Sequence, residues 1–525
     1  MEQKDLIAPQ RYNLAEEIRR FASGEDRTAL IYEDEQGNKN TITYDALVKR
    51  ANKVSQALQA QGLEKGDVIL VMVPRLIEAY TIYLAAIQAG IVVIPSSEML
   101  RAKDIDYRIT HSRAKAVVAY APLVAEFDDA KHMDGLKKFT IGDAQGWLNL
   151  SSIANDYDEQ FDVVETNSQD TVFLSYTSGT TGNPKAAVHT HSWAYAHLRT
   201  ASRAWLGAEE GRIVWATASP GWQKWIWSPF LSVLGTGAIG FVYNGHFEPH
   251  KYLQLLQDYK VEALCCTPTE YRIMAKIENL ADYDLSHLKS AVSAGEPLNV
   301  EVVDTFEREF GLTVRDGYGQ TENTLLVGTM LGMTPRPGSM GKPTPGNIVD
   351  IVNEDGEVCE PGVVGNIAVH KSTPALFKEY FEDPARTAQQ YIGDYYITGD
   401  RARKDEDGYF WFEGRRDDII ISSGYTIGPF EVEDALIKHP TVAECAVVAS
   451  PHELRGAIVK AYVVLKDKSQ LEKDEQGFIK ELQNFVKEHT APYKYPRAIE
   501  FIDELPKTTS GKIRRIELRE AEYQR

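Results

Sequence analysis

Short apolar segments that alternate with helical stretches run through the first 320 residues of this 525-residue chain. Asp67–Val73 and Gly90–Pro95 are of strand type, and Leu76–Gln88 between them has the pattern of a helix. Continuous apolar strands joined by helices are typical of parallel sheets covered on both faces. The sequence therefore predicts an α/β fold with ligands at the carboxyl ends of the strands. Further strand and helix units occur at 212–218, 261–277 and 288–310.

The character of the sequence changes twice beyond residue 335. Turn signals such as Pro335-Arg-Pro-Gly338 and Asp407-Gly408 predict a small β section that completes the large domain. Past Asp417, expected strands at 442–449, 458–465 and 498–502 and a helix at 477–489 predict a compact α+β unit. A chain of this length is too long for one core. We expect a large N-terminal domain at 1–416 and a small C-terminal domain at 417–525.

The composition excludes some classes of function. The net charge of −19 argues against nucleic acid as a partner, because phosphate binding needs clustered Lys and Arg. The four cysteines lack metal-ligand spacing, and Cys265-Cys266 belongs to an apolar strand. A disulfide framework is therefore not expected, which fits a reducing compartment. The N-terminus shows no secretory signal, and the apolar runs are too short to span a bilayer. We expect a cytoplasmic protein without membrane insertion, and a homodimer stays open.

A loop rich in Gly, Ser and Thr follows the expected strand Thr171–Tyr176. It reads Thr177-Ser-Gly-Thr-Thr-Gly-Asn-Pro-Lys185, in which small residues let backbone N–H groups point at phosphate oxygens and Lys185 adds positive charge. Such clusters are also common in plain surface loops. A Walker A loop is excluded, because Asn-Pro separates Gly182 from Lys185 and Ala186 follows the lysine.

Four further motifs occur later in the chain, and with Thr177–Lys185 they resemble, in type and order, the signatures of the adenylate-forming superfamily. That superfamily comprises acyl-CoA synthetases, luciferases and peptide-synthetase adenylation domains. The resemblance covers essentially the whole chain and is strongest for the medium-chain acyl-CoA synthetases. The four motifs are Gly317-Tyr-Gly-Gln-Thr-Glu322, Tyr396-Ile-Thr-Gly-Asp400, Gly414-Arg-Arg-Asp-Asp-Ile419 and Pro506-Lys-Thr-Thr-Ser-Gly-Lys512.

The resemblance implies an acyl-CoA synthetase that uses ATP, Mg²⁺ and coenzyme A. Such an enzyme joins a carboxylic acid to ATP as an acyl-AMP, releases pyrophosphate, and then passes the acyl group to CoA with release of AMP. Both reactants of the first step are anions, so positive groups and a divalent cation are needed to offset their repulsion. The implied catalytic residues are Lys512, Glu322, Thr321 and Lys185, with Glu322 as the Mg²⁺ ligand.

The same resemblance assigns the nucleotide contacts. Asp400 would accept hydrogen bonds from the ribose hydroxyls, Arg415 would reach the same sugar, and Lys512 would bridge the acyl carboxylate and the phosphate. Without the resemblance, the segment that ends at Lys512 would be an exposed basic turn. The implied ATP-binding residues are Thr177, Ser178, Gly179, Thr180, Thr181, Gly182, Lys185, Asp316, Gly317, Tyr318, Gly319, Gln320, Thr321, Asp400, Arg415 and Lys512.

A site that performs two reactions in turn needs two arrangements. The resemblance implies that the C-terminal domain rotates about Asp417, after which the segment 422–428 would face the site. Thr426 departs from the medium-chain group, which commonly has Arg after Ser-Gly-Tyr, and this weakens one polar contact near the CoA channel. The implied CoA contacts are Ser423, Gly424, Tyr425, Arg455 and Lys487.

Two positions bear on the choice of acid. Gly319 stands where the similar acetate-specific synthetases carry Trp, so we expect space for several more carbons and a short- to medium-chain acid, straight or branched. The glycine could instead serve only the backbone. Gly221-Trp-Gln-Lys-Trp-Ile-Trp227 gathers three indoles, of which Trp222 is a candidate for the acyl pocket. Aromatic acids also stay open.

Three alternatives remain at this point. The chain could load the acyl group onto a carrier protein, act as a luciferase-like oxygenase, or be a nucleotide-binding protein that has lost catalysis. The joint presence of Lys185, Glu322, Asp400, Arg415 and Lys512 speaks against the last of these, because all the required chemical groups are retained.

Overall fold

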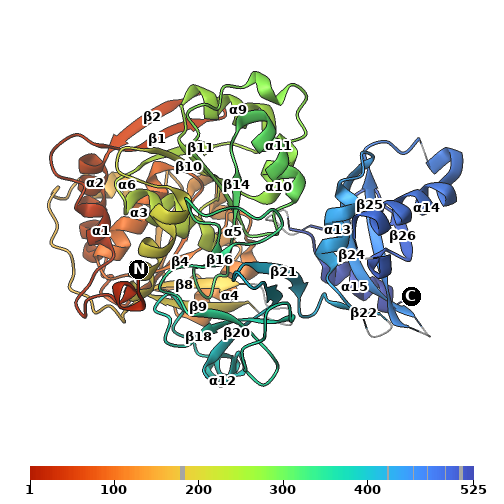
Figure 1. The fold of residues 1–525 in the computed structure, drawn as a ribbon. Helices are drawn as coiled ribbons and strands as arrows, with labels where there is room; N and C mark the ends of the chain where they lie inside the picture. The colour runs from red at the N-terminus through yellow and green to blue at the C-terminus, as the bar shows by residue number, and fades with distance from the viewer. Residues whose placement is uncertain are drawn as a thin grey trace.

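The computed structural model describes residues 1–177, 184–422, 425–452, 455–469, 471–490, 492–507 and 512–524. Four β-sheets organise these residues, three in the part up to Arg415 and one beyond it. Figure 1 shows the first three sheets and their helices packed together, with the last sheet and its helices gathered at one side beyond β21.

The first sheet has seven strands in the order β7-β6-β5-β3-β4-β8-β9 and is parallel except for the β8–β9 pair. Its central strands are buried, as expected for a parallel sheet covered on both faces. The strands are β3 (Val68–Met72), β4 (Val92–Pro95), β5 (Ala116–Tyr120), β6 (Lys137–Ile141), β7 (Leu148–Asn149), β8 (Thr171–Thr177) and β9 (Lys185–Thr190).

The second sheet has nine strands in the order β16-β15-β14-β13-β12-β10-β11-β1-β2. The run from β14 to β1 is parallel, and antiparallel strands close both edges. The largest core cluster contains residues of both sheets, with α3 buried along most of its length. The strands are β1 (Thr28–Asp34), β2 (Lys39–Thr43), β10 (Ile213–Ala216), β11 (Ile239–Asn244), β12 (Ala263–Cys266), β13 (Ser290–Ala294), β14 (Val314–Gly319), β15 (Leu325–Gly328) and β16 (Lys342–Pro343).

The third sheet is antiparallel and corresponds to the turn-rich β section expected after residue 335. Its last strand leads toward the fourth sheet, whose core is formed by residues from Ile420 onward. The third sheet consists of β17 (Val349–Val352), β18 (Gly365–His370), β19 (Tyr391–Ile392), β20 (Tyr395–Lys404) and β21 (Phe410–Arg415). The fourth consists of β22 (Ile420–Ser422), β23 (Tyr425–Ile427), β24 (Val442–His452), β25 (Gly456–Leu465) and β26 (Ala498–Phe501).

The helices have recognisable start signals. Thr43 caps α2 by accepting from Ala46 N, and Thr267 with Glu270 forms a capping box at α10, where Pro268 is the first residue. The α-helices are α1 (Ala15–Arg19), α2 (Tyr44–Ala60), α3 (Ile77–Gln88), α4 (Ala102–Ser112), α5 (Val124–Asp128), α6 (Leu150–Ala154), α7 (His191–His197), α8 (Gln223–Trp225), α9 (Pro249–Asp258), α10 (Pro268–Met274), α11 (Val300–Phe310), α12 (Pro384–Gln389), α13 (Pro429–Ile437), α14 (Leu471–His489) and α15 (Arg515–Gln524). Two π-helical segments, η3 (Leu198–Leu206) and η4 (Ile226–Ser232), lie in the large part.

The predicted fold class is confirmed: parallel-rich sheets with helices, a small β section and a final α+β unit are all present. The expected strands and helices at 67–95, 212–218, 261–277 and 288–310 are found with ends that shift by a few residues. Within the described ranges, no helix is both long and apolar enough to cross a membrane.

The chain passes from the third sheet to the fourth in a turn between β21 and β22, where the expected domain boundary at Asp417 falls. The two parts approach closely at Gly428, because a Cβ there would stand 2.0 Å from Glu413 O. Further contacts between them include the hydrogen bonds from Asn299 Nδ2 to Asp434 Oδ1 (3.2 Å) and from Lys276 Nζ to Ala443 O (3.4 Å), and the rings of Phe412 and Phe430, whose centroids are 6.5 Å apart.

Candidate functional site

The first group of site residues surrounds Lys185. The β8–β9 hairpin pairs Thr177 with Lys185 and brings the lysine to the segment after β14. Lys185 Nζ lies 3.1 Å from Glu322 Oε1, and both side chains are largely buried. The Tyr380 hydroxyl accepts from Lys185 Nζ (2.6 Å) and donates to Glu322 Oε1 (2.7 Å). The expected phosphate contacts Ser178, Gly179, Thr180, Thr181 and Gly182 lie outside the described residues.

The second group surrounds Asp400 on β20. Tyr318 donates its hydroxyl proton to Asp400 Oδ2 (2.5 Å), and Gln320 Nε2 donates to the same oxygen (2.9 Å). Arg415 is paired with Asp400 in the sheet register, and its Nε lies 3.8 Å from Oδ1. Burial raises the pKa of Asp400, while the Tyr318 hydroxyl and Arg415 oppose that rise. The motifs at 317–322, 396–400 and 414–419 thus meet at one carboxylate.

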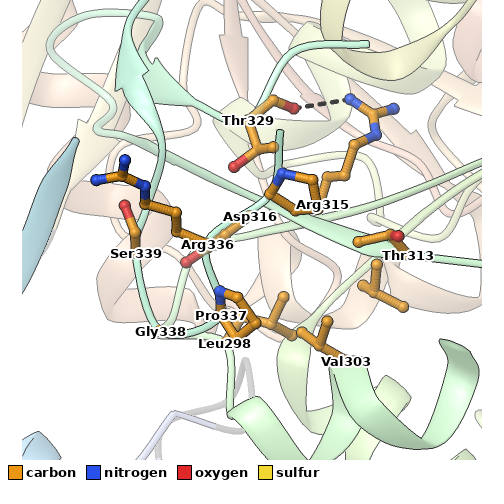
Figure 2. A pocket seen from close by; sticks show the side chains of 12 residues that line it. Leu298, Val303, Thr313, Arg315, Asp316, Thr329, Arg336, Pro337, Gly338 and Ser339 are labelled. Atoms are coloured by element: carbon orange, nitrogen blue, oxygen red, sulfur yellow. Dashed lines mark hydrogen bonds between the residues drawn. The ribbon is translucent and has the colours of Figure 1, made fainter. Parts of the chain in front are cut away.

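Asp316 lies on β14, one residue before the glycine that begins the same motif. Figure 2 shows it beside the hydrogen bond from Arg315 Nη1 to Thr329 O (2.8 Å), with the segment Arg336–Ser339 across from it. The cavity between them has a volume of about 20 Å³, which is room for one water molecule. Burial raises the pKa of Asp316 to about 7.

Two lysines reach the carboxyl end of β13. Lys224 Nζ donates to Ala294 O at 2.5 Å, and Lys512 Nζ lies 4.0 Å from the position of a Cβ on Gly295. Residue Lys512 is exposed as a whole, but the protein around its ammonium end desolvates that charge and lowers its pKa. Lys224 and Arg415 act in the same direction, and Glu296 and Asp400 act against it. Lys512 therefore lies at the carboxyl end of the parallel strands, which is the edge where ligands bind in such sheets.

Glu322 offers what a magnesium ion bound with phosphates would use. Mg²⁺ is commonly held by one or two carboxylates together with substrate phosphates. Both close contacts of the carboxylate fall on Oε1, and no hydrogen bond reaches Oε2 from the described part of the chain. Within that part there is also no cluster of three or more His, Cys, Asp and Glu that could form an all-protein metal cage. The residues present fit a metal that arrives with its nucleotide.

The structure shows no open space at the position that a Cβ on Gly319 would take, and the place of Gly319 in the acyl pocket stays a prediction. A Cβ on Gly319 would stand 2.1 Å from Thr324 O and 2.8 Å from Trp227 Cη2. The glycine is required by the close approach of the backbone at 324, beside a bulge in the β14–β15 pair. The indole of Trp227, which belongs to η4, occupies the adjacent volume.

The three indoles of the 221–227 segment lie in different surroundings. Trp225 and Trp227 are buried, and Trp225 stacks on Phe230 at 5.5 Å. Trp222, the candidate for the acyl pocket, is only partly buried and stands before the first turn of α8. Sequence reasoning considered Trp222 and missed Trp227, whose position beside Gly319 depends on the packing of η4 rather than on a motif.

The hinge candidate Asp417 is exposed in the turn between β21 and β22. Its backbone carbonyl accepts from Arg519, which also donates to Asp418 Oδ1 at 2.8 Å. Arg519 belongs to α15, so the last helix braces this turn.

The CoA candidates lie on the C-terminal sheet and helix. Tyr425 stacks on Tyr493 with ring centroids 4.6 Å apart, and Lys487 Nζ lies 4.2 Å from the centre of the Tyr495 ring. Arg455 directly precedes β25, and its backbone N–H donates to His452 O. Ser423 and Gly424 lie outside the described residues.

Comparisons with known proteins agree on one family. The model of the AMP-binding enzyme family matches residues 18–381, and that of the AMP-binding enzyme C-terminal domain matches residues 431–512. The chain is 61% identical to the uncharacterized acyl-CoA ligase YtcI of Bacillus subtilis (strain 168) over 100% of this chain and 98% of the relative. It is 39% identical to the mitochondrial acyl-coenzyme A synthetase ACSM3 of Rattus norvegicus over 98% and 91%.

Solved structures give the same result. The anthranilate CoA ligase AuaEII in complex with anthranoyl-AMP superposes with a TM-score of 0.90 at 27% identity, covering 100% of this chain and 99% of that one. ATP-bound MatB from Rhodopseudomonas palustris superposes with a TM-score of 0.86 at 28% identity, covering 97% and 99%.

The chain belongs to the AMP-binding enzyme family, within the adenylate-forming superfamily and close to the medium-chain acyl-CoA synthetases. It is an AMP-forming acid–thiol ligase that works with ATP, Mg²⁺ and CoA. The expectation drawn from the motifs is thereby confirmed at the level of family and reaction type.

The raised pKa of Asp316 predicts a pH-dependent cost in stability. An ordinary Asp pKa is 3.8 and the folded value is about 7, so the fold favours the neutral carboxyl. The stability that the neutral form contributes is complete below pH 4 and is lost as the pH rises through 7. Residue Asp316 is in part exposed to solvent, so the loss of stability should be smaller than the full pKa shift implies. We expect Asp316→Asn to be more stable than the wild type by about 1–3 kcal/mol at pH 8 and equal to it near pH 4.

Differential scanning calorimetry of the two proteins across this pH range measures the difference. A gap in Tm that stays constant with pH would contradict a titration of Asp316.

Proposed function

We propose that this acyl-CoA synthetase activates a short- to medium-chain carboxylic acid, with the N-terminal part at 1–416 binding ATP and acid and the C-terminal part at 417–525 supplying Lys512. The position of Lys512 is the observation that carries the assignment of roles. Its ammonium lies at the carboxyl end of β13, although it comes from a segment more than two hundred residues further along the chain. A basic turn that only faces solvent would not be expected to place its ammonium at this edge of the sheet.

In the first half-reaction an oxygen of the acid attacks the α-phosphorus of ATP, and the pyrophosphate leaves with the electron pair of the broken P–O bond. Lys512 and Lys185 would each donate to oxygens that gain negative charge, and preorganised donors of this kind stabilise such a transition state. Asp400, held by Tyr318 and Gln320, would accept from the ribose hydroxyls, with Arg415 at the same sugar. A bound Mg²⁺ supplies charge neutralisation on the phosphates.

In the second half-reaction the CoA thiol attacks the acyl carbon, its proton is lost, and AMP leaves with the electron pair of the C–O bond. The C-terminal part would first rotate about Asp417, which withdraws Lys512 and brings the 422–428 segment to the site. Tyr425, Arg455 and Lys487 would then contact CoA together with Ser423 and Gly424.

The acid would lie between Trp222 and the Gly319–Trp227 contact. Since Trp227 limits the volume beside Gly319, its indole sets the length of the acid in this proposal. The named substrates of the similar ligases, anthranilate and benzoate, support extending the range to aromatic acids.

A cytoplasmic location and a homodimer belong to the proposal as well. All four cysteines are free and buried, which supports a reducing compartment.

A panel of short, medium, branched and aromatic acids with ATP and CoA tests the substrate class by AMP release. We expect Trp227→Ala to move the preference toward larger acids, since each additional buried methylene contributes about 0.8 kcal/mol, or about fourfold in kcat/KM. Trp215→Phe, at a buried indole in another core cluster, is the control. In the acid panel, no AMP from any acid would refute acid activation, and AMP with a carrier protein but not with CoA would favour carrier loading. An unchanged preference for acid size in Trp227→Ala would show that Trp227 does not line the acid pocket.

Replacing Lys512 separates the two half-reactions. We expect Lys512→Ala to lower acid-dependent ATP–pyrophosphate exchange by about 10²–10³-fold, because a preorganised donor is lost. The variant should still convert a supplied acyl-AMP and CoA to the thioester. Lys507→Ala, which removes an ammonium paired with Glu444 at 2.8 Å nearby, is the matched control. Exchange near the wild-type rate would show that Lys512 does not serve adenylation.

Restricting the backbone at Asp417 tests the hinge. Asp417→Pro fixes φ at about −65° and should slow thioester formation from acyl-AMP more than it slows pyrophosphate exchange. Asp417→Ala, which removes the carboxylate but leaves φ free, should affect both little. Equal losses in the two half-reactions for the proline variant would count against rotation at this residue.

A further inference from the structure

The hydroxyl of Tyr380 connects two groups that the sequence motifs treat separately. It accepts from the ammonium of Lys185 at 2.6 Å and donates to Oε1 of Glu322 at 2.7 Å. The same ammonium lies 4.2 Å from the centre of the tyrosine ring. Lys185 is thus held by the oxygen, the ring and the carboxylate at once, and none of the five motifs described above includes Tyr380.

The backbone around Tyr380 is fixed to both partners. Residue Tyr380 forms a β-bridge with Ala187 on β9, and the N–H groups of Lys378 and Phe381 donate to Val188 O (2.9 Å) and Ala186 O (2.8 Å). These hydrogen bonds tie the segment to the strand that begins with Lys185.

The other partner is tied by Phe377 N, which donates to Glu322 O at 2.7 Å. The Tyr380 ring itself is almost fully buried and packs on Phe377 at 4.8 Å. The segment that carries Tyr380 is therefore hydrogen-bonded to the backbone of β9 and to that of Glu322, and these bonds fix the position of the hydroxyl.

A neutral hydroxyl is suited to this place. It offers one donor and two acceptor sites, so it can donate to a carboxylate while it accepts from an ammonium. Burial and the neighbouring Glu322 raise the pKa of Tyr380, so the group keeps its proton at physiological pH. Because its O–H donates to Oε1, the hydroxyl fixes the rotation of the carboxylate and leaves Oε2 for a metal ion.

We propose that Tyr380 is a positioning residue for the adenylation half-reaction, which orients the Glu322 carboxylate toward Mg²⁺ and holds Lys185 beside it until the phosphates of MgATP take over the ammonium. This inference rests on the proposed function, because it assigns Glu322 to the metal and Lys185 to phosphate.

The proposal distinguishes the two half-reactions. Without the hydroxyl, the carboxylate can turn and pair with Lys185 through both oxygens, and MgATP must break that closer ion pair. Binding of MgATP then weakens, whereas binding of the acid and the attack of the thiol on acyl-AMP need neither Glu322 nor Lys185. A hydrogen bond to a charged group is worth about tenfold or somewhat more in an equilibrium constant.

The test uses the full-length protein with Tyr380→Phe, which keeps the ring and removes only the oxygen. Calorimetric titration of ATP at increasing Mg²⁺ measures binding without turnover, and pyrophosphate exchange and thioester formation from supplied acyl-AMP measure the half-reactions. We expect the Mg²⁺ concentration for half-maximal ATP binding and the KM for MgATP to rise about 3–10-fold. The KM for the acid and the rate from acyl-AMP should stay within twofold of the wild type.

Tyr271→Phe is the matched control, because Tyr271 is a fully buried tyrosine of another cluster whose hydroxyl donates to Leu264 O at 3.3 Å. It should change neither the Mg²⁺ dependence nor the half-reactions. A Tyr380→Phe protein with unchanged Mg²⁺ dependence would overturn the proposal. So would an equal loss in both half-reactions together with a lowered Tm, because that pattern indicates general destabilisation.

A double-mutant cycle with Glu322→Gln locates the effect. If Tyr380 acts through the carboxylate, Tyr380→Phe should no longer change Mg²⁺-dependent ATP binding in the Glu322→Gln background. An undiminished effect there would overturn the assigned route. Failure of the proposed function has a different signature, since the wild type would then show no acid-dependent pyrophosphate exchange at all.

Discussion

The ion pair between Lys185 and Glu322 joins the three sheets of the large part at one point. Lys185 begins β9 of the first sheet, Glu322 follows β14 of the second, and Tyr380 lies between β18 and β20 of the third. Placing two charges out of water is costly unless they are paired and hydrogen-bonded. The tyrosine hydroxyl completes that requirement, so the relative position of the sheets and the positions of Lys185 and Glu322 depend on the same contact.

Positive charge is in excess at the edge where the two parts of the chain meet. Lys512, Lys224 and Arg415 lie near one another there, and desolvation, together with repulsion from Lys224 and Arg415, lowers the pKa of Lys512. Glu296 and Asp400 offset only part of that cost. Excess positive charge makes this arrangement costly for the protein alone, and anions that bind at this edge would favour it.

The sequence predicted much of this arrangement because its signals were local. Alternating apolar segments gave the strands β3, β4, β10, β12 and β13, and motif order indicated that Glu322, Asp400 and Arg415 belong to one site. What the sequence could not show depends on packing between distant segments. β1 and β2 join the second sheet beside β11, about two hundred residues later in the chain, and nothing in their own pattern specifies that partner. Tyr380 likewise has a role only through the two strands that surround it.

Gly319 shows why a single position cannot specify a pocket. A change from Trp to Gly creates open space only if no other group fills the volume of the indole. Protein interiors are closely packed, so such a volume is commonly filled. Here the backbone at Thr324 and the ring of Trp227 lie against the glycine, so the volume beside it depends on β14, the bulge between Tyr318 and Gly319, and η4 together. The length of the preferred acid should therefore depend more on the residue at 227 than on the one at 319.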